Sequence, residues 1–334
     1  MRLLVLGGTV FLGDAIVRNA LDRGWDVTTF SRGRSGAAAD GAETLHGDRE
    51  QAGDLEQLRD RAWDAVVDTS GFIPAVVGCA AGLLVDQVPS YAFISSISVY
   101  PDMLAESVDE QARIQDCPAD ATGGEYGELK AGCERAVTGA YGDRALLVRP
   151  GLLLGPRENI GRLPWWLQRI AAGGDVLAPG RPERPLQYVD ARDLAAWLLD
   201  ALEAGMTGPV NVVSEPGFTT MGELLEACVR ATGSAARLRW TPEALLAEHF
   251  VEPWIELPCW VPELAPTMAG FFAVRVERAA SSGLRCRPVT ETVADTWAWL
   301  QAGGVPIPRP GLPPLGMPPE KEQAVLAALD APAP

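Results

Sequence analysis

The clearest indication of the fold is the segment Leu3-Leu4-Val5-Leu6-Gly7-Gly8-Thr9-Val10-Phe11-Leu12-Gly13 near the start of the chain. Its four leading apolar residues predict a buried strand, and an apolar-periodic segment over 11–21 predicts a helix that ends at Gly24. Glycines between a first strand and a first helix let the backbone approach a pyrophosphate, which the free N–H groups of the helix then bind. The alternative interpretation is a tight turn without a ligand.

Short apolar runs alternate with helical patterns through the first half of the chain. Strands are expected at 26–30, near Leu45, and at 65–67, 91–95 and 145–148, with a helix at 76–85. Continuously apolar strands that alternate with helices predict a parallel sheet covered on both faces. The predicted fold class is therefore α/β, a doubly wound parallel (Rossmann) sheet with a smaller C-terminal α/β part that binds substrate.

We expect a dinucleotide-binding domain over residues 1–150 and a mainly substrate-binding part over 151–300. Helices are predicted at 164–172, 190–204, 221–231, 242–249 and 289–300. A strand is expected at 186–189, and the segment 210–213 is a candidate to return to the first sheet. Residues 251–266, rich in Pro and Trp, predict an irregular cap, and 301–334 a Pro/Gly-rich tail with a short terminal helix.

The composition disfavours several classes of protein. The chain has 334 residues, a net charge of −16 and only 2 histidines. This charge disfavours a nucleic-acid or anionic-membrane surface, and no metal site is predicted. The 6 cysteines contain no Cys-x-x-Cys pair, which indicates free thiols in a reducing compartment. Without a signal-peptide pattern or an apolar run of about 20 residues, we expect a cytoplasmic protein. Its partner is a small-molecule substrate, and a homodimer stays open.

Tyr126 and Lys130 are the strongest catalytic candidates. Lys130 is one of two lysines in the chain, and it lies on the same helical face as Tyr126, four residues earlier. An ammonium about 4 Å from a phenol favours phenolate by roughly 4 kcal/mol at an effective dielectric of about 20. That lowers a phenol pKa from about 10 towards about 7, which suits acid–base catalysis. The alternative is a chance pair on an exposed helix.

The end of the second predicted strand bears on the choice of cofactor. Ser31 stands where an acidic residue would hold the ribose 2′-hydroxyl of NAD, and Arg32 and Arg34 follow it. Guanidinium groups bind a 2′-phosphate that a carboxylate would repel. We therefore predict NADP(H) rather than NAD(H). The alternative is a solvated loop with ordinary surface arginines.

The order of these motifs resembles the short-chain dehydrogenase/reductase superfamily, in its extended or atypical NAD-dependent epimerase/dehydratase branch. The resemblance spans about residues 1–300, and it rests on the glycine motif, in which Val10 replaces the usual middle glycine, and on the Tyr-x-x-x-Lys signature. Together with the residues themselves, it implies cofactor contacts from Gly7, Thr9, Val10, Phe11, Leu12, Gly13, Ser31, Arg32, Arg34, Asp48, Thr69, Ser70, Gly71, Lys130 and Pro150.

The resemblance also implies a catalytic serine and a substrate side. Alignment on Val99-Tyr100 makes Ser96 the serine that donates a hydrogen bond to a substrate oxygen, with Ser95 and Ser98 as competitors. Tyr126 would exchange a proton with that oxygen, and Lys130 would lower the tyrosine pKa and hold the nicotinamide ribose. The residues expected near the substrate are Ser98, Leu152, Trp166 and Gln187.

Position 152 bears on the class of substrate. Sugar-nucleotide enzymes of this branch carry an asparagine there that contacts the diphosphate, and a leucine cannot make that contact. We therefore expect a substrate without a nucleoside diphosphate, unless an arginine at 157, 162 or 169 supplies a phosphate site. The tryptophans at 165, 166, 254 and 260 either stack on the substrate or pack in a core.

These residues predict an NADP(H)-dependent oxidoreductase of the epimerase/dehydratase type, with hydride transfer at a secondary alcohol or ketone and Tyr126 as acid or base. One alternative is an epimerase that keeps NAD(P) bound and inverts a stereocentre through a transient ketone. Another is a non-catalytic protein that senses NADP(H), although such proteins in related branches usually lack the Tyr-Lys pair. RNA binding, known among atypical relatives, is disfavoured by the net charge.

Overall fold

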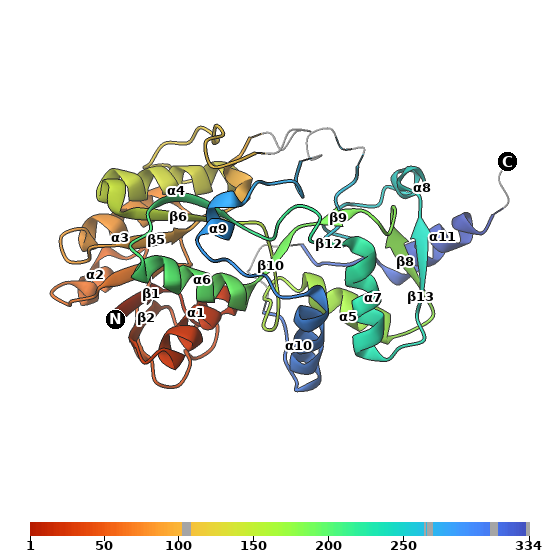
Figure 1. Cartoon of the computed structure of the whole chain (residues 1–334), viewed down its shortest axis with the longest axis horizontal. Helices are drawn as coiled ribbons and strands as arrows, with labels where there is room; N and C mark the ends of the chain where they lie inside the picture. Colours follow the sequence, from red (N-terminus) through yellow and green to blue (C-terminus); the bar gives the residue numbers. More distant parts are fainter. Residues whose placement is uncertain (102–107, 264, 266–269, 308–312, 332–334) are drawn as a thin grey trace.

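A seven-stranded parallel sheet forms one side of the molecule (Figure 1). The computed structural model describes residues 1–101, 108–263, 265, 270–307 and 313–331. The strands lie in the order β11-β6-β5-β4-β1-β2-β3. Their bounds are β1 (Arg2–Leu6), β2 (Asp26–Ser31), β3 (Glu43–His46), β4 (Ala65–Asp68), β5 (Tyr91–Ile94), β6 (Ala145–Pro150) and β11 (Gly208–Val212). The strand order reverses between β1 and β4, which is where ligands bind in open sheets of this kind.

The sheet is covered on both faces. Leu3 and Val5 of β1 pack into one core with α1 (Phe11–Asp22) and α6 (Ala191–Glu203). Leu4 and Leu6 point the other way, into a core with α3 (Pro74–Leu84) and α4 (Tyr126–Tyr141). Successive strand side chains alternate between faces, so a strand buried on both sides is apolar throughout. The predicted doubly wound α/β fold is confirmed, and β11 returns to the sheet beside β6.

Short elements complete the sheet side of the molecule. They are α2 (Ala52–Leu55), α9 (Glu277–Ser281), and the 3-10 turns η1 (Glu56–Leu58), η2 (Ile97–Val99) and η3 (Gly142–Arg144). A separate two-stranded sheet follows in the chain after β6: β7 (Leu152–Leu154) pairs in parallel with β10 (Tyr188–Asp190). This pair leads from the sheet into the second core.

A second core lies on the other side of the molecule (Figure 1). Its helices are α5 (Arg162–Ala171), α7 (Met221–Thr232), α8 (Glu243–Glu248) and α10 (Val289–Gln301). The short pair of β9 (Pro185–Leu186) and β12 (Thr219–Thr220) is antiparallel. The sequence did not predict β8 (Asp175–Pro179) and β13 (Arg237–Thr241), which pair in parallel although 62 residues separate their first positions.

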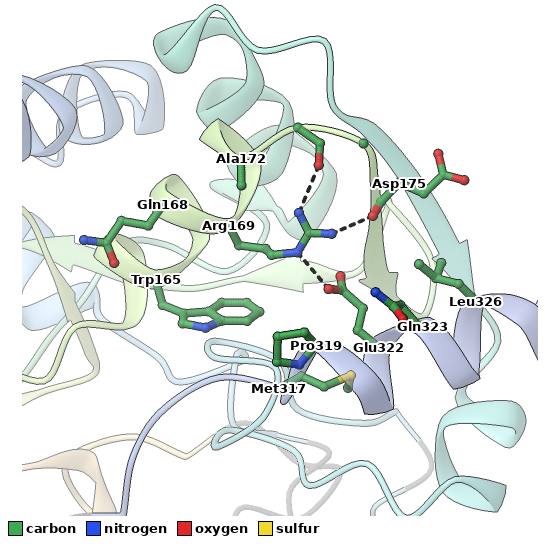
Figure 2. A pocket seen from close by; sticks show the side chains of 12 residues that line it. Trp165, Gln168, Arg169, Ala172, Asp175, Met317, Pro319, Glu322, Gln323 and Leu326 are labelled. Atoms are coloured by element: carbon green, nitrogen blue, oxygen red, sulfur yellow. Dashed lines mark hydrogen bonds and ion pairs between the residues drawn. The ribbon is translucent and has the colours of Figure 1, made fainter.

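The last helix, α11 (Pro319–Leu329), is fastened to the second core by Glu322 (Figure 2). The Glu322 carboxylate accepts hydrogen bonds from Arg169 Nε at 2.8 Å and from the Leu177 N–H at 3.0 Å. Arg169 also donates to the carbonyl oxygens of Gly173 and Asp175. A cleft of about 720 Å³ beside these groups is lined by Trp165, Met317 and Leu326, among others. The terminal segment therefore closes one side of the second core.

Two features of the described residues bear on function. No helix among them is long and apolar enough to cross a membrane. Within the same residues, no three His, Cys, Asp or Glu side chains gather closely enough to hold a metal ion.

Candidate active site

The glycine-rich loop between β1 and α1 has a backbone that favours glycine at its first two positions. Gly7 and Gly8 have φ values of +112° and +95°. A Cβ on Gly7 would lie 2.3 Å from Thr69 Oγ1, and a Cβ on Gly13 would lie 2.7 Å from the Gly8 nitrogen. The loop is therefore pressed against the end of β4 on one side and against the first turn of α1 on the other. Such a bare backbone at a helix N-terminus fits a pyrophosphate.

A cleft of about 300 Å³ opens at the carboxyl ends of β2 and β3. Its walls include Thr9 of the glycine-rich loop, Ser31, His46 and the segment 36–42. Ser31 lies opposite His46 in the strand register. Arg32 and Arg34 follow β2 and are exposed. The cleft thus joins the glycine-rich loop to the residues expected to hold the adenosine ribose.

Lys130 is almost completely buried, with 3% of its surface exposed. Its ammonium donates hydrogen bonds to the carbonyl oxygens of Gly71 and Ile94, both at 2.8 Å. The ring centroids of Phe72 and Phe93 lie 4.6 and 4.8 Å from the same nitrogen, within cation–π range. Lys130 is thus held where the chain leaves β4 and β5, near the carboxyl edge of the sheet.

Tyr126 is the first residue of α4 and keeps 46% of its surface exposed. A capping box between Glu125 and Glu128 defines the start of this helix. Gly127, the next residue, allows a close approach to η2, because a Cβ there would lie 2.2 Å from the Ser98 carbonyl oxygen. The helix therefore exposes Tyr126 beside η2, while Lys130, one turn later, enters the interior.

Ser96 and Ser98 are in direct contact. Ser96 Oγ accepts a hydrogen bond from the Ser98 N–H at 3.1 Å, and the two hydroxyl oxygens lie 3.1 Å apart. Ser96 is 8% exposed and Ser98 more so. The Ser95 hydroxyl is buried without a hydrogen-bond partner among the described residues. Of the three serines, the structure thus pairs Ser96 and Ser98 beside the first turn of α4.

Two largely buried ion pairs underlie the site, and no local sequence pattern predicts either pairing. Arg149, at the end of β6, binds Glu134 of α4 through both carboxylate oxygens. Arg49 binds Asp68, at the end of β4, in the same bidentate manner. Burial raises the pKa of the Asp68 carboxyl, but Arg49 and further hydrogen bonds outweigh burial and hold it below its usual value. The one sequence signal for these pairs was Asp68, an acidic residue at the end of an otherwise apolar strand, which needs a positively charged partner when buried.

The remaining cofactor candidates follow the edge of the sheet. Asp48 comes after β3, where its N–H donates to Asp54 Oδ2 at 2.7 Å. Thr69 and Ser70 follow β4, and the hydroxyl of each donates to the Leu6 carbonyl oxygen at 3.1 Å. Pro150 is the last residue of β6. These candidates therefore converge on the carboxyl edge that carries the glycine-rich loop.

The candidate substrate residues of the C-terminal part are buried. Trp166 is 0% exposed and donates its indole N–H to the Pro258 carbonyl oxygen. The Gln187 amide bonds the backbone of Ser214 and of Val274. Leu152 packs in the second core. Trp166 and Gln187 thus act as internal supports here, with polar atoms that are already bonded.

The other tryptophans and arginines considered for the substrate also have defined places. Trp260 is buried, whereas Trp165 and Trp254 are partly exposed. Arg157 pairs with Asp14 of α1 at 3.0 Å. Arg169 bonds Glu322 of α11 and the backbone carbonyls of Gly173 and Asp175 (Figure 2). The guanidinium of Arg162 lies 4.7 Å from the Trp254 ring centroid.

Known proteins resemble this chain in fold and in sequence. The structure of UDP-glucose 4-epimerase superimposes with a TM-score of 0.68 at 17% identity, covering 90% of this chain and 98% of that one. The enzyme WbmH of Bordetella bronchiseptica, solved in complex with NAD+, gives a TM-score of 0.70 at 19% identity, covering 91% and 99%. At these identities the likeness concerns the fold alone.

One curated relative is the chloroplast stem-loop binding protein of 41 kDa b of Arabidopsis thaliana, which is 26% identical over 255 residues. That alignment covers 70% of this chain, but this chain spans only 63% of the length of the relative. The model of the NAD dependent epimerase/dehydratase family matches residues 3–81 and 80–213. The match covers more than half of the chain and includes the glycine-rich loop, the paired serines, Tyr126 and Lys130, so this protein belongs to the NAD dependent epimerase/dehydratase family.

Proposed function

We propose that this protein is an NADP(H)-dependent oxidoreductase that transfers hydride at a secondary alcohol or ketone of a small molecule. The observation that carries the proposal is the placement of Lys130. Its buried ammonium is held by the carbonyl of Gly71, three residues after β4, and by that of Ile94, the last residue of β5. One helical turn earlier, Tyr126 is exposed beside the serine pair. A proton carrier, a cation and a hydroxyl donor therefore share one edge of the sheet.

Each residue has a distinct part in the proposed reaction. The Ser96 hydroxyl, which donates to Ser98 Oγ in the free protein, turns its single proton to the substrate oxygen and orients it, and the Ser98 hydroxyl then donates to Ser96. Tyr126 gives a proton to that oxygen in reduction or removes one in oxidation. Lys130 contributes the positive charge that favours the phenolate form of the tyrosine. When bound, the nicotinamide cofactor supplies or accepts the hydride.

The cleft after β2 and β3 supports NADP(H) as the cofactor. At the end of β2, Ser31 offers the cleft a hydroxyl where a carboxylate would hold the ribose of NAD, and the exposed Arg32 and Arg34 follow within three residues. The wall of the cleft itself includes Asp40 and neither arginine, so the arginines would have to turn toward a bound 2′-phosphate. A guanidinium group binds a 2′-phosphate through charge and paired N–H donors.

The start of α5 supports a substrate without a nucleoside diphosphate. A helix N-terminus is a natural anion site, because its first N–H groups lack partners within the helix. Here the carboxylate of Glu158 accepts from the N–H groups of Arg162 and Leu163, at 2.8 and 3.0 Å. Glu158 is 1% exposed, and burial raises its pKa. Glu158 therefore occupies the anion site at the start of α5, and Leu152 is packed in the second core. A free sugar, a small ketone or a secondary-metabolite scaffold fits this arrangement better than a nucleoside diphosphate does.

The decisive experiment follows NADPH at 340 nm with a panel of ketones and aldoses, with product analysis in parallel. Consumption of NADPH in proportion to product supports a reductase. Product formed without NADPH consumption supports the epimerase alternative, with a retained NAD(P). Binding of NADPH without turnover on any member of the panel favours the cofactor-sensing alternative.

The Arabidopsis relative is named a stem-loop binding protein, which makes a nucleic-acid stem-loop, here taken as RNA, the second candidate partner. The net charge of −16 opposes it, because phosphate contacts need clustered cations. Filter binding of a stem-loop RNA at 150 mM salt tests this candidate, and submicromolar retention would favour RNA over a small molecule. As part of the proposal we place the protein in the cytoplasm, where its six free cysteines stay reduced, and keep a homodimer as its assembly.

A further inference from the structure

We propose that Arg49 and Asp68 are positioning residues for the nicotinamide half of the cofactor, acting through the loop Thr69–Gly71 that bonds Lys130. This inference rests on the proposed NADP(H) function. It concerns a pair of residues that lie 19 positions apart in the chain and meet only in the folded protein.

The Asp68 carboxylate is completely buried, and four hydrogen bonds surround it. Oδ1 accepts from Arg49 at 2.7 Å and from the Ser70 N–H at 3.0 Å. Oδ2 accepts from Arg49 at 2.8 Å and from the Tyr91 hydroxyl at 2.9 Å. A buried carboxylate is stable only when it is paired and hydrogen-bonded in this way. Asp68 therefore depends on Arg49 for its charge balance.

The pair fixes the turn that follows β4. Arg49 donates a further bond to the Ser70 hydroxyl at 3.0 Å, and that hydroxyl donates to the Leu6 carbonyl oxygen. Leu6 is the last residue of β1 and directly precedes Gly7. Arg49 and Asp68 thus tie the turn to the start of the glycine-rich loop, where the pyrophosphate is expected.

The same turn reaches the catalytic lysine. Gly71, the third residue of the turn, gives its carbonyl oxygen to the Lys130 ammonium at 2.8 Å. The path from Arg49 to Lys130 therefore runs through Asp68, the Ser70 N–H and the Gly71 carbonyl. A shift of this turn moves one of the two carbonyls that hold the ammonium.

The adenosine side has anchors that do not involve Arg49. Gly47 donates its N–H to the Ser31 carbonyl oxygen at 3.0 Å, and Asp48 donates to Asp54 at 2.7 Å. Gln57 holds the His46 carbonyl oxygen at 3.1 Å. The loss of Arg49 should consequently disturb the nicotinamide half of the site and spare the adenosine half.

The test compares two probes on Arg49→Met, which keeps the length of the side chain and removes its charge. NADPH occupies both halves of the site and reports its nicotinamide environment by its own fluorescence, whereas 2′,5′-ADP occupies the adenosine half alone. We expect the Kd of NADPH to rise at least tenfold, with loss of the bound-state emission shift, and that of 2′,5′-ADP to change less than twofold. The Kd of NADPH for Arg49→Lys should lie between those for the unaltered protein and for Arg49→Met.

The matched control is Arg59→Met, at an exposed arginine that pairs with Glu56. It should bind both probes like the unaltered protein. An NADPH Kd within twofold of normal in Arg49→Met overturns the inference. An equal loss of affinity for NADPH and for 2′,5′-ADP also overturns it. So does an Arg49→Lys variant that binds NADPH no more tightly than Arg49→Met does. If Arg49→Met does not fold, Arg49→Met/Asp68→Asn removes both buried charges and is judged by the same criteria. If the unaltered protein binds neither probe, it is the proposed cofactor that fails.

Discussion

Arg149 and Glu134 form a bidentate ion pair inside the protein, with Nε–Oε1 and Nη2–Oε2 distances of 2.9 and 2.7 Å. Their side chains are only 4% and 2% exposed. Arg149 is the next-to-last residue of β6, and it also donates to the Tyr100 hydroxyl at 3.0 Å, which donates to Asn211 of β11. The pair therefore joins α4, the helix that carries Tyr126 and Lys130, to the strands beneath it.

Removing one charge of this pair should destabilise the protein strongly. Glu134→Gln leaves the guanidinium buried without its counter-charge, and we expect a loss of about 3–5 kcal/mol in the free energy of unfolding. Urea denaturation followed by tryptophan fluorescence measures it. The control is Glu226→Gln on α7, whose pair with Arg230 is exposed and should change stability by less than about 0.5 kcal/mol. Equal effects of the two changes would contradict a structural role for the buried pair.

Tyr126→Phe should abolish most of the activity and leave the fold and cofactor binding intact, because only the proton-carrying oxygen is lost. A positioned acid or base contributes typically about 10²–10⁴-fold to the rate. The measurement is the initial rate with a substrate found in the NADPH screen. Tyr141→Phe is the matched control: it removes a buried hydroxyl, without a hydrogen-bond partner among the described residues, from the other end of α4. Near-normal turnover by Tyr126→Phe would exclude the assigned role.

Ser31→Asp combined with Arg32→Ala should reverse the preference from NADP(H) to NAD(H). The new carboxylate can accept from the ribose 2′-hydroxyl and repels a 2′-phosphate. Dissociation constants for both reduced cofactors, from tryptophan fluorescence quenching, give the preference of each protein. As a control, Arg230→Ala removes an exposed arginine on α7 and should leave the cofactor preference unchanged. Tighter binding of NADH than of NADPH by the unaltered protein would contradict the prediction.

UDP and dTDP should bind weakly to the protein saturated with NADP(H). Glu158 fills the N-terminus of α5, and Leu152 offers no polar atom to a diphosphate. Isothermal titration calorimetry is expected to show no binding in the micromolar range. A Kd near 1 μM, about −8 kcal/mol, would reveal a nucleotide pocket that forms in spite of both residues.

One cysteine per chain should react rapidly with Ellman's reagent at pH 8. Cys79 is exposed, whereas burial raises the pKa of Cys133 and of Cys286 to about 12. The other three thiols are buried. A raised pKa keeps a thiol protonated, and only the thiolate reacts, so these groups should stay slow up to about pH 9. Cys79→Ser should remove the fast phase, and two or more fast equivalents in the unaltered protein would contradict this assignment.

Local patterns were sufficient to predict the framework of the site. An apolar run, glycines and a helical period are all read within some 20 neighbouring residues, and they indicate the same strand-loop-helix unit that the structure contains. The helical repeat places residues four apart on one face, so the sequence was enough to put Tyr126 and Lys130 on the same side of α4. The segment 210–213 was a candidate to return to the first sheet, and β11 does lie beside β6 there.

The burial of side chains and the pairing of charges could not be predicted from local patterns. Trp166 and Gln187 have the residue types of a ligand wall, but the packing of the second core buries both. Arg49 and Asp68 lie in separate segments, and no local period relates them. Burial and ion pairing depend on contacts between segments far apart in the chain, so they arise only once those segments are packed together. The kind of fold and the candidate residues follow from local patterns in the sequence, whereas the burial of Trp166 and the pairing of Arg49 with Asp68 follow from the tertiary structure.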